Sequence, residues 1–287
     1  MSMDAYLNLS TFCRETARAW RSNHLYCLVD HAGMPGLHRE LVRAGVPWTS
    51  LFAASREEAV LQAAPLLFSL DRHAKKAHGQ LLTWLARRGT YTSSLLMLSS
   101  PLELEELGRR LARRMQARIS ESMDVLLRFF DPRVFEALMA SLDKQQRDAF
   151  VGVADSWWYV DRCGNVVAQP ARYDADDAFN SPLILSASQE FALVDASEVD
   201  QIATQLEGTM PDAYNIMPPP QRYAFLQRQM EAAMGDGVMG TYEVSLYCGL
   251  ALLYGEDFSA TTAWQNTFIK VRAGARLSDL VADETHD

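Results

Sequence analysis

Charged and histidine side chains gather at two places where a run of apolar residues stops. Asp30 and His31 follow the run LYCLV, while Arg128, Asp131 and Arg133 surround the end of the run VLLRFF. An aspartate and a histidine can form an acid–base pair, and arginines near a helix N-terminus can help to bind an anionic ligand. These residue types allow an enzyme that uses Asp30, His31 and Asp131 at strand ends. Adjacent residues of a strand, however, point to opposite sides.

The same residues also have a structural interpretation. Asp131 lies where an N-cap carboxylate accepts free helix amides, and Pro132 lies at the first helical position, where its missing N–H costs nothing. Apolar residues at helical spacing follow, starting with Val134 and Phe135. We therefore interpret Asp131-Pro132-Arg133 as a strand-to-helix hinge. An ion pair with Arg128 or Arg133 is favoured over an anion site.

Short catalytic and cofactor motifs are absent from the sequence. It contains no GxxxxGK(S/T) phosphate loop, no HExxH zinc helix and no GxSxG nucleophile elbow. GDGVMG (residues 235–240) matches GxGxxG but follows an expected helix, so we interpret it as a loop. His73 and His78 are five residues apart, which places them on different faces of a helix. We predict no catalytic residue, no cofactor and no metal site.

The sequence has the character of a cytoplasmic protein. Its four cysteines lie far apart without a CxxC pair, which favours reduced thiols. No stretch reaches the roughly 18 consecutive apolar residues of a membrane span. The N-terminus lacks a basic start followed by an apolar block, so no secretory signal is expected.

Strand and helix patterns alternate through the first half of the chain. Strands are expected at residues 25–30, 46–52, 93–100 and 125–130. Helices are expected at residues 5–22, 35–45, 55–65, 74–89, 101–118 and 132–142. This alternation predicts an α/β lobe with a small, mostly parallel sheet and flanking helices.

The pattern changes after residue 150. A hairpin is expected with strands at residues 157–160 and 166–169, followed by a polar linker at 170–182. Helix patterns then dominate, so we predict an α/β lobe at residues 1–170 and an all-α lobe at 183–287. Residues 1–150 carry 20 Lys and Arg against 16 Asp and Glu, and the remainder carries 7 against 20. The acidic second half argues against broad nucleic-acid binding, which needs clustered cations.

Two groups of side chains are candidates for binding a partner protein. In the expected strand, alternation places Trp157 and Tyr159 on one face and Trp158 on the other, so at least one of them serves the core. The acidic lobe is rich in methionines, including Met230 and Met234, whose flexible thioethers suit adaptable apolar contacts. These methionines can equally fill a helical core.

Several motifs occur in the order that is typical of one family. They include YCLVDHAG, VPWTSLF, LLTWLARRG and above all LLRFFDPRVFEALMASLDKQQRDAFVG. On these motifs the sequence resembles the domain-of-unknown-function 4123 family, the adaptor chaperones of bacterial type VI secretion. The resemblance extends from about residue 25 to residue 158, and more loosely to LLYGEDF near the C-terminus.

The resemblance implies a non-enzymatic role. Proteins of this family bind a toxic effector in the cytoplasm and help to load it onto the trimeric VgrG spike protein. By this resemblance, Asp30, Arg128, Asp131, Pro132 and Arg133 are fold signatures without a catalytic role. An enzyme with a helical cap and an immunity-like protein that blocks a toxin are the alternative functions.

Overall fold

The structure of the protein is a computed structural model that describes residues 24–53, 63–70, 77–120 and 123–284. Within these residues the chain separates into two compact units, the first ending at Val194 and the second starting at Asp195. This division lies inside one long helix, further along the chain than the linker at 170–182. The helix expected at residues 5–22 lies outside the described residues, and the one expected at 55–65 lies largely outside them.

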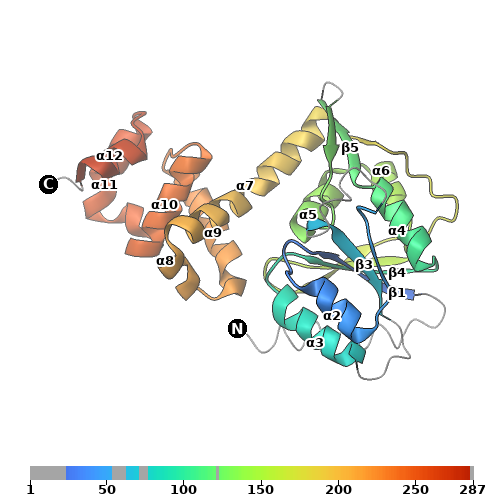
Figure 1. The fold of residues 1–287 in the computed structure, drawn as a ribbon. Coiled ribbons are helices and arrows are strands. Elements are labelled where there is room, and N and C mark those ends of the chain that lie inside the picture. Colours follow the sequence, from blue (N-terminus) through green and yellow to red (C-terminus); the bar gives the residue numbers. More distant parts are fainter. Residues whose placement is uncertain (1–23, 54–62, 71–76, 121–122, 285–287) are drawn as a thin grey trace. The chain divides into compact units, whose positions relative to one another are not determined.

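A six-stranded sheet forms the centre of the first unit (Figure 1). Its strands are β1 (His24–Asp30), β2 (Trp48–Ser50), β3 (Pro65–Ser69), β4 (Leu95–Ser100), β7 (Ser156–Val160) and β8 (Val166–Pro170). They lie in the order β2-β3-β1-β4-β7-β8, and every neighbouring pair is antiparallel. The expectation of a mostly parallel sheet is therefore wrong, whereas the expected hairpin is confirmed as β7 and β8.

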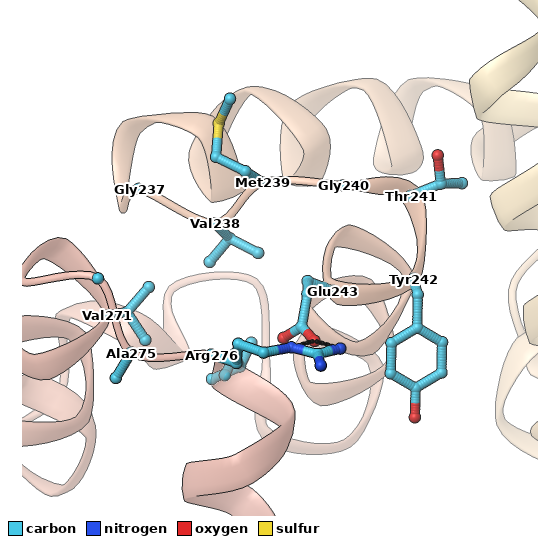
Figure 2. A pocket seen from close by; sticks show the side chains of 12 residues that line it. Gly237, Val238, Met239, Gly240, Thr241, Tyr242, Glu243, Val271, Ala275 and Arg276 are labelled. Carbon is cyan, nitrogen blue, oxygen red and sulfur yellow. Dashed lines mark hydrogen bonds and ion pairs between the residues drawn. The ribbon is translucent and has the colours of Figure 1, made fainter.

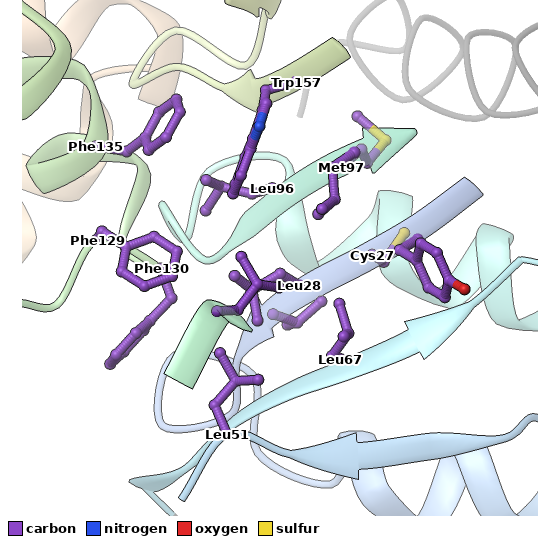
Figure 3. Packing of buried hydrophobic residues seen from close by; sticks show 14 of the residues in the cluster. Cys27, Leu28, Leu51, Leu67, Leu96, Met97, Phe129, Phe130, Phe135 and Trp157 are labelled. Atoms are coloured by element: carbon purple, nitrogen blue, oxygen red, sulfur yellow. The ribbon is translucent and has the colours of Figure 1, made fainter. Parts of the chain in front are cut away.

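The burial of the central strands explains this error. All residues of β4 and nearly all of β1 are buried, so both faces of these strands are covered. Continuous apolar runs of this kind are typical of parallel strands, because helices cover both faces of a parallel sheet. Here the same burial occurs in an antiparallel sheet. Figure 3 shows Leu28 of β1 in this core beside Leu67 of β3 and Leu96 of β4, its two partners in register.

Strand β3 is an element that the sequence patterns did not indicate. It begins at Pro65, a position where a strand tolerates proline because it is the first residue. It pairs with β1 on one side and β2 on the other. Because β3 lies between them, β1 and β2 are not neighbours, and the strand–helix–strand unit expected there does not form.

Among the described residues of the first unit, five helices come before α7 (Ala187–Thr209). They are α2 (Leu37–Ala44), α3 (Ala77–Gly89), α4 (Leu104–Arg113), α5 (Pro132–Ser141) and α6 (Lys144–Val151). Helices α2 and α3 lie side by side (Figure 1). Gly45 ends α2 in the left-handed region at φ 64°, a conformation in which glycine is the usual cap residue. Gly108 lets α4 approach β2, because a β-carbon there would lie 2.9 Å from Thr49 Cγ2.

A second, smaller sheet lies in the same unit. It consists of β5 (Gln116–Ile119), β6 (Met123–Leu126) and β9 (Leu183–Ile184), in the order β6-β5-β9. Strand β5 pairs antiparallel with β6 and parallel with β9. The helix expected through residue 118 therefore ends at Arg113. The strand expected to reach Phe130 ends at Leu126, so Phe129 and Phe130 are buried beyond its end.

The second unit consists of helices around its own apolar core. Its elements, with the helix that enters it, are α7 (Ala187–Thr209), α8 (Pro211–Ile216), α9 (Pro219–Gly235), α10 (Thr241–Tyr254), the 3-10 helix η3 (Phe258–Ala260), α11 (Thr262–Arg272) and α12 (Leu277–Glu284). The rings of Tyr247, Phe258 and Phe268 contact one another at its centre. Across the described part of the chain, no helix combines the length and apolar character that crossing a membrane requires.

Candidate functional site

The start of α5 positions the first group of charged residues. Asp131 is the N-cap of this helix, because its Oδ1 accepts a hydrogen bond from the Arg133 amide at 3.0 Å. Pro132 occupies the first turn, and the Arg133 guanidinium donates to both carboxylate oxygens, at 3.0 and 2.7 Å. The N-terminal end of the helix and the arginine both interact favourably with the carboxylate of Asp131. The predicted capping role of Asp131 is confirmed.

Asp30 lies at the end of β1, within electrostatic reach of Asp131. Its Oδ1 accepts the Ala32 amide at 3.0 Å, and its Oδ2 accepts a hydrogen bond from Arg128 at 2.7 Å. Burial raises the pKa of Asp30 and the Asp131 carboxylate adds to this rise, while Arg128 and the Ala32 amide oppose it. The structure thus brings Asp30, Arg128, Asp131 and Arg133 together, which we call the hinge cluster.

His31 lies next to this cluster but contacts another histidine. It is buried, and its Nε2 lies 3.2 Å from Nδ1 of His38 on α2. Among the residues that the structure describes, no three His, Cys, Asp or Glu side chains are placed to hold a metal ion. The three residues of the enzymatic interpretation are therefore each engaged within the fold, Asp30 and Asp131 by arginines and amides and His31 by His38.

The aromatic residues of β7 mostly serve the core. Trp157 is fully buried, donates its indole N–H to the Val151 carbonyl at 2.9 Å and stacks on Phe135 (Figure 3). Tyr159 is buried on the same face, and burial raises the pKa of its hydroxyl group. Trp158 lies on the other face and is half-buried. Trp157 and Tyr159 therefore present almost no surface to a partner, contrary to their proposed binding role, and Trp158 alone retains some.

The two candidate methionines lie in different surroundings, although both belong to α9. Met230 is half-buried and packs against the core of the second unit. Met234 is 68% exposed, and Met239 in the following loop is 75% exposed. Of the two, only Met234 offers a largely free side chain to a partner.

A buried ion pair that the sequence patterns did not indicate holds residues 171–182, which we call the strap. Arg114 has no exposed surface, and its guanidinium donates to Asp177 at 2.6 Å and to the carbonyls of Phe150, Ala149 and Arg110. Burial lowers the pKa of Arg114, and the bond to Asp177 opposes this. The polar composition of the strap indicated a linker, yet Asp177 is tied to α4 through this pair.

The second unit contains a pocket of about 450 Å³ (Figure 2). The loop between α9 and α10 and the start of α10 line one side, and the turn between α11 and α12 lines the other. Val238 and Leu277 contribute apolar walls, and Met239 and Tyr242 are largely exposed at its lining. Inside it, Glu243 accepts hydrogen bonds from Arg276 and from the amide and hydroxyl groups of Ser278. The glycines of GDGVMG were the one sequence signal for this loop.

Comparison with known proteins relates the first unit to one family. The family model described as Domain of unknown function (DUF4123) matches residues 25–149, which include the whole hinge cluster but neither the β7–β8 hairpin nor the pocket. No curated protein and no solved structure matches the chain. The chain therefore carries a domain of the DUF4123 family at residues 25–149.

Proposed function

We propose that this protein is a non-enzymatic adaptor chaperone that binds a type VI secretion effector in the cytoplasm and helps to load it onto the VgrG spike. The observation that carries the proposal is the DUF4123 match over residues 25–149. The proposal also draws on the motif resemblance, through which this family is associated with effector delivery.

The contacts of the hinge cluster support a binding function over an enzymatic one. General acid–base catalysis needs a group within hydrogen-bond reach of substrate. The side chains of Asp30 and Asp131 are each only 6% exposed, and each already accepts an arginine and a backbone amide. Little of either carboxylate is therefore accessible to a substrate, and the partners already present compete with it.

Exposed apolar side chains on both units give an adaptor the contact surface that it needs. Largely exposed examples are Met123, Ile184 and Phe191 in the first unit, and Met239 and Tyr242 in the second. Truncating such side chains at an interface is costly where they become fully desolvated by the partner. Partner binding thus has physical candidates in both units.

Affinity purification of the full chain from its native host tests the proposal. The expected result is co-purification of one large secreted toxin, with or without VgrG, and loss of that toxin's secretion when the chain is deleted. Unimpaired secretion of every effector in the deletion strain would contradict an adaptor role. Protection of the host from the toxin without any effect on its secretion would instead indicate an immunity-like function.

Two variants separate the binding function from the enzymatic alternative. Asp30→Asn and Asp131→Asn keep the size of each side chain and its ability to accept an amide, so both are expected to retain the fold and partner capture. An enzyme that uses these carboxylates would lose its turnover in both variants. Loss of effector delivery by folded variants that still capture the effector would therefore count against the adaptor proposal.

A truncated chain shows whether the first unit is sufficient for capture. The truncation belongs after Val194, because ending the chain near Ala171 would remove the strap and its bond to the buried Arg114. Retention of full capture by residues 1–194 would place the effector site in the first unit.

A further inference from the structure

Three glycines with positive φ line the pocket of the second unit. Gly237, Gly240 and Gly274 line it, with φ between 83° and 102°, where other residues are strained. A β-carbon at Gly240 or Gly274 would meet nothing within 4 Å. Bare backbone therefore forms much of the wall, and the space beside it is unfilled by the described residues.

The charged groups in this pocket compensate each other. Glu243 is 7% exposed and is held by Arg276 and Ser278. These bonds outweigh burial, so the pKa of Glu243 lies below its usual value. Because Glu243 and Arg276 already pair with each other and apolar walls lie beside them, the pocket suits an uncharged side chain. A charged side chain inserted there would lose its hydration and find no free, oppositely charged group among the described lining residues to replace it.

The net negative charge of the protein comes entirely from the second unit, which contains this pocket. Residues 195–287 contain 14 Asp and Glu against 5 Lys and Arg, a net charge of −9, whereas residues 1–194 contain 22 of each sign. Three of those five cations already pair with acids of the same unit, Arg228 with Glu256, Arg272 with Asp236 and Arg276 with Glu243. The unit therefore attracts a cationic partner and repels an acidic one.

We propose that this pocket binds a basic segment of a partner protein, inserting one apolar or aromatic side chain while flanking Lys and Arg residues face the acidic surface. Met239 and Tyr242 belong to the lining of the pocket and are largely exposed, so the bound segment covers part of both side chains. The identification of this partner as the effector rests on the proposed function, whereas the chemistry of the segment rests on the pocket and the charge of the unit.

A displayed library of random 12-residue peptides, selected on the full chain, tests the chemistry of the segment. The expected enriched peptides carry a Leu, Phe, Tyr or Trp residue flanked by Lys or Arg, and their binding weakens as salt rises. Enrichment of acidic peptides, of peptides without cations, or of no peptide at all would overturn the inference.

Matched variants locate the binding of an enriched peptide. Tyr242→Ala and Met239→Ala remove exposed side chains that line the pocket, and Ala275→Trp adds bulk at a third exposed lining position. Each is expected to weaken binding by about tenfold or more, as for a central interface residue. Tyr254→Ala and Ile269→Ala remove similarly exposed side chains that do not line the pocket, and are expected to change binding less than about twofold. Equal effects of the two sets would overturn the inference.

Effector capture by the same variants separates this inference from the proposed function. If Tyr242→Ala and Ala275→Trp still capture the effector as the native chain does, the adaptor proposal stands and the pocket is not the effector's site. If the native chain captures no effector but binds the selected peptides through the pocket, the pocket inference stands and the adaptor proposal fails.

Discussion

At the scale of single residues, the charged groups around the hinge are parts of the fold. A carboxylate such as Asp131 accepts hydrogen bonds from a helix amide and from an arginine at the same time, so its removal leaves that amide without its cap. Residue type and order were sufficient to predict this cap, because Asp-Pro at the start of an apolar helical stripe has a local cause. The contact between Asp30 and Arg128 spans 98 positions and was not predictable from local pattern.

The capping role of Asp131 predicts the effect of its replacement on stability. Asp131→Ala is expected to lower the free energy of unfolding by about 1–2 kcal/mol, the usual range for loss of an N-cap. Asp131→Asn is expected to lower it less, because the amide oxygen still accepts the Arg133 N–H. Urea denaturation followed by circular dichroism measures both. Asp124→Ala is the matched control, because Asp124 forms an exposed ion pair with Arg118. The urea midpoint of this variant is expected to equal that of the native protein.

The raised pKa of Asp30 predicts a pH dependence of stability. A carboxyl group whose pKa is raised in the folded state binds a proton more tightly there than in the unfolded chain. Its contribution to stability is therefore fully present below the unfolded pKa of about 4 and is lost as the pH rises through the folded pKa. Asp30→Asn, which cannot ionise, is thus expected to gain stability relative to the native protein between pH 4 and pH 7. Urea titrations of both proteins at these two pH values measure the difference, and a difference that shrinks with pH would contradict the assignment.

At the scale of elements, local pattern predicted where strands and helices form better than how strands pair. The β7–β8 hairpin followed from a short turn between two apolar segments, because its pairing partner is close in sequence. The pairing of β1 with β3 and β4 has no such local signal. The end of α4 was also predicted wrongly, because arginines are common in the last turns of a helix and the helical pattern extends to residue 118. In the structure α4 ends at Arg113, and the Arg114 side chain points into the core.

The strap shows how tertiary contacts can order a segment of linker-like composition. Asp177 adopts φ 49°, an uncommon conformation for a residue other than glycine, and its side chain is only 6% exposed. Phe179 of the strap is also buried, and the centroid of its ring lies 4.5 Å from the guanidinium carbon of Arg114. Because β9 follows the strap and pairs with β5, release of the strap would also free an edge of the smaller sheet.

This arrangement predicts that Arg114→Met loosens the strap. Removing one partner of a buried ion pair leaves Asp177 buried with less compensation, so a loss of about 3–5 kcal/mol in the free energy of unfolding is expected. Limited trypsin digestion is expected to cleave after Arg172 earlier than in the native protein, with mass spectrometry identifying the site. Arg109→Met is the control on the same helix, because Arg109 forms an exposed pair with Glu106. Equal cleavage rates in the two variants would show that Arg114 does not hold the strap.

Across the protein as a whole, the net charge and the apolar cores are both divided between the same two units. The two apolar cores share no residue, and the net charge lies entirely in the second unit. The sequence indicated a change of composition near mid-chain, but not that the strap belongs to the first unit and that α7 continues across the boundary. The pocket was likewise not predictable from the sequence, because the turn between α11 and α12 lies more than thirty positions after the GDGVMG loop that it faces.

One buried cysteine in each unit allows the order in which the units unfold to be predicted and measured. Cys27 lies in β1 of the first unit and Cys248 in α10 of the second, and burial raises the pKa of Cys248 to about 12. Both are expected to resist N-ethylmaleimide at pH 8 in the folded protein, because the thiolate is the reactive form. As urea rises, Cys248 is expected to react first, since the smaller unit buries a smaller fraction of its surface. Pulsed labelling with mass spectrometry of each cysteine peptide measures the two midpoints, with half-buried Cys163 as an accessible reference. Coincident midpoints for Cys27 and Cys248 would mean that the units unfold as one, with α7 coupling them.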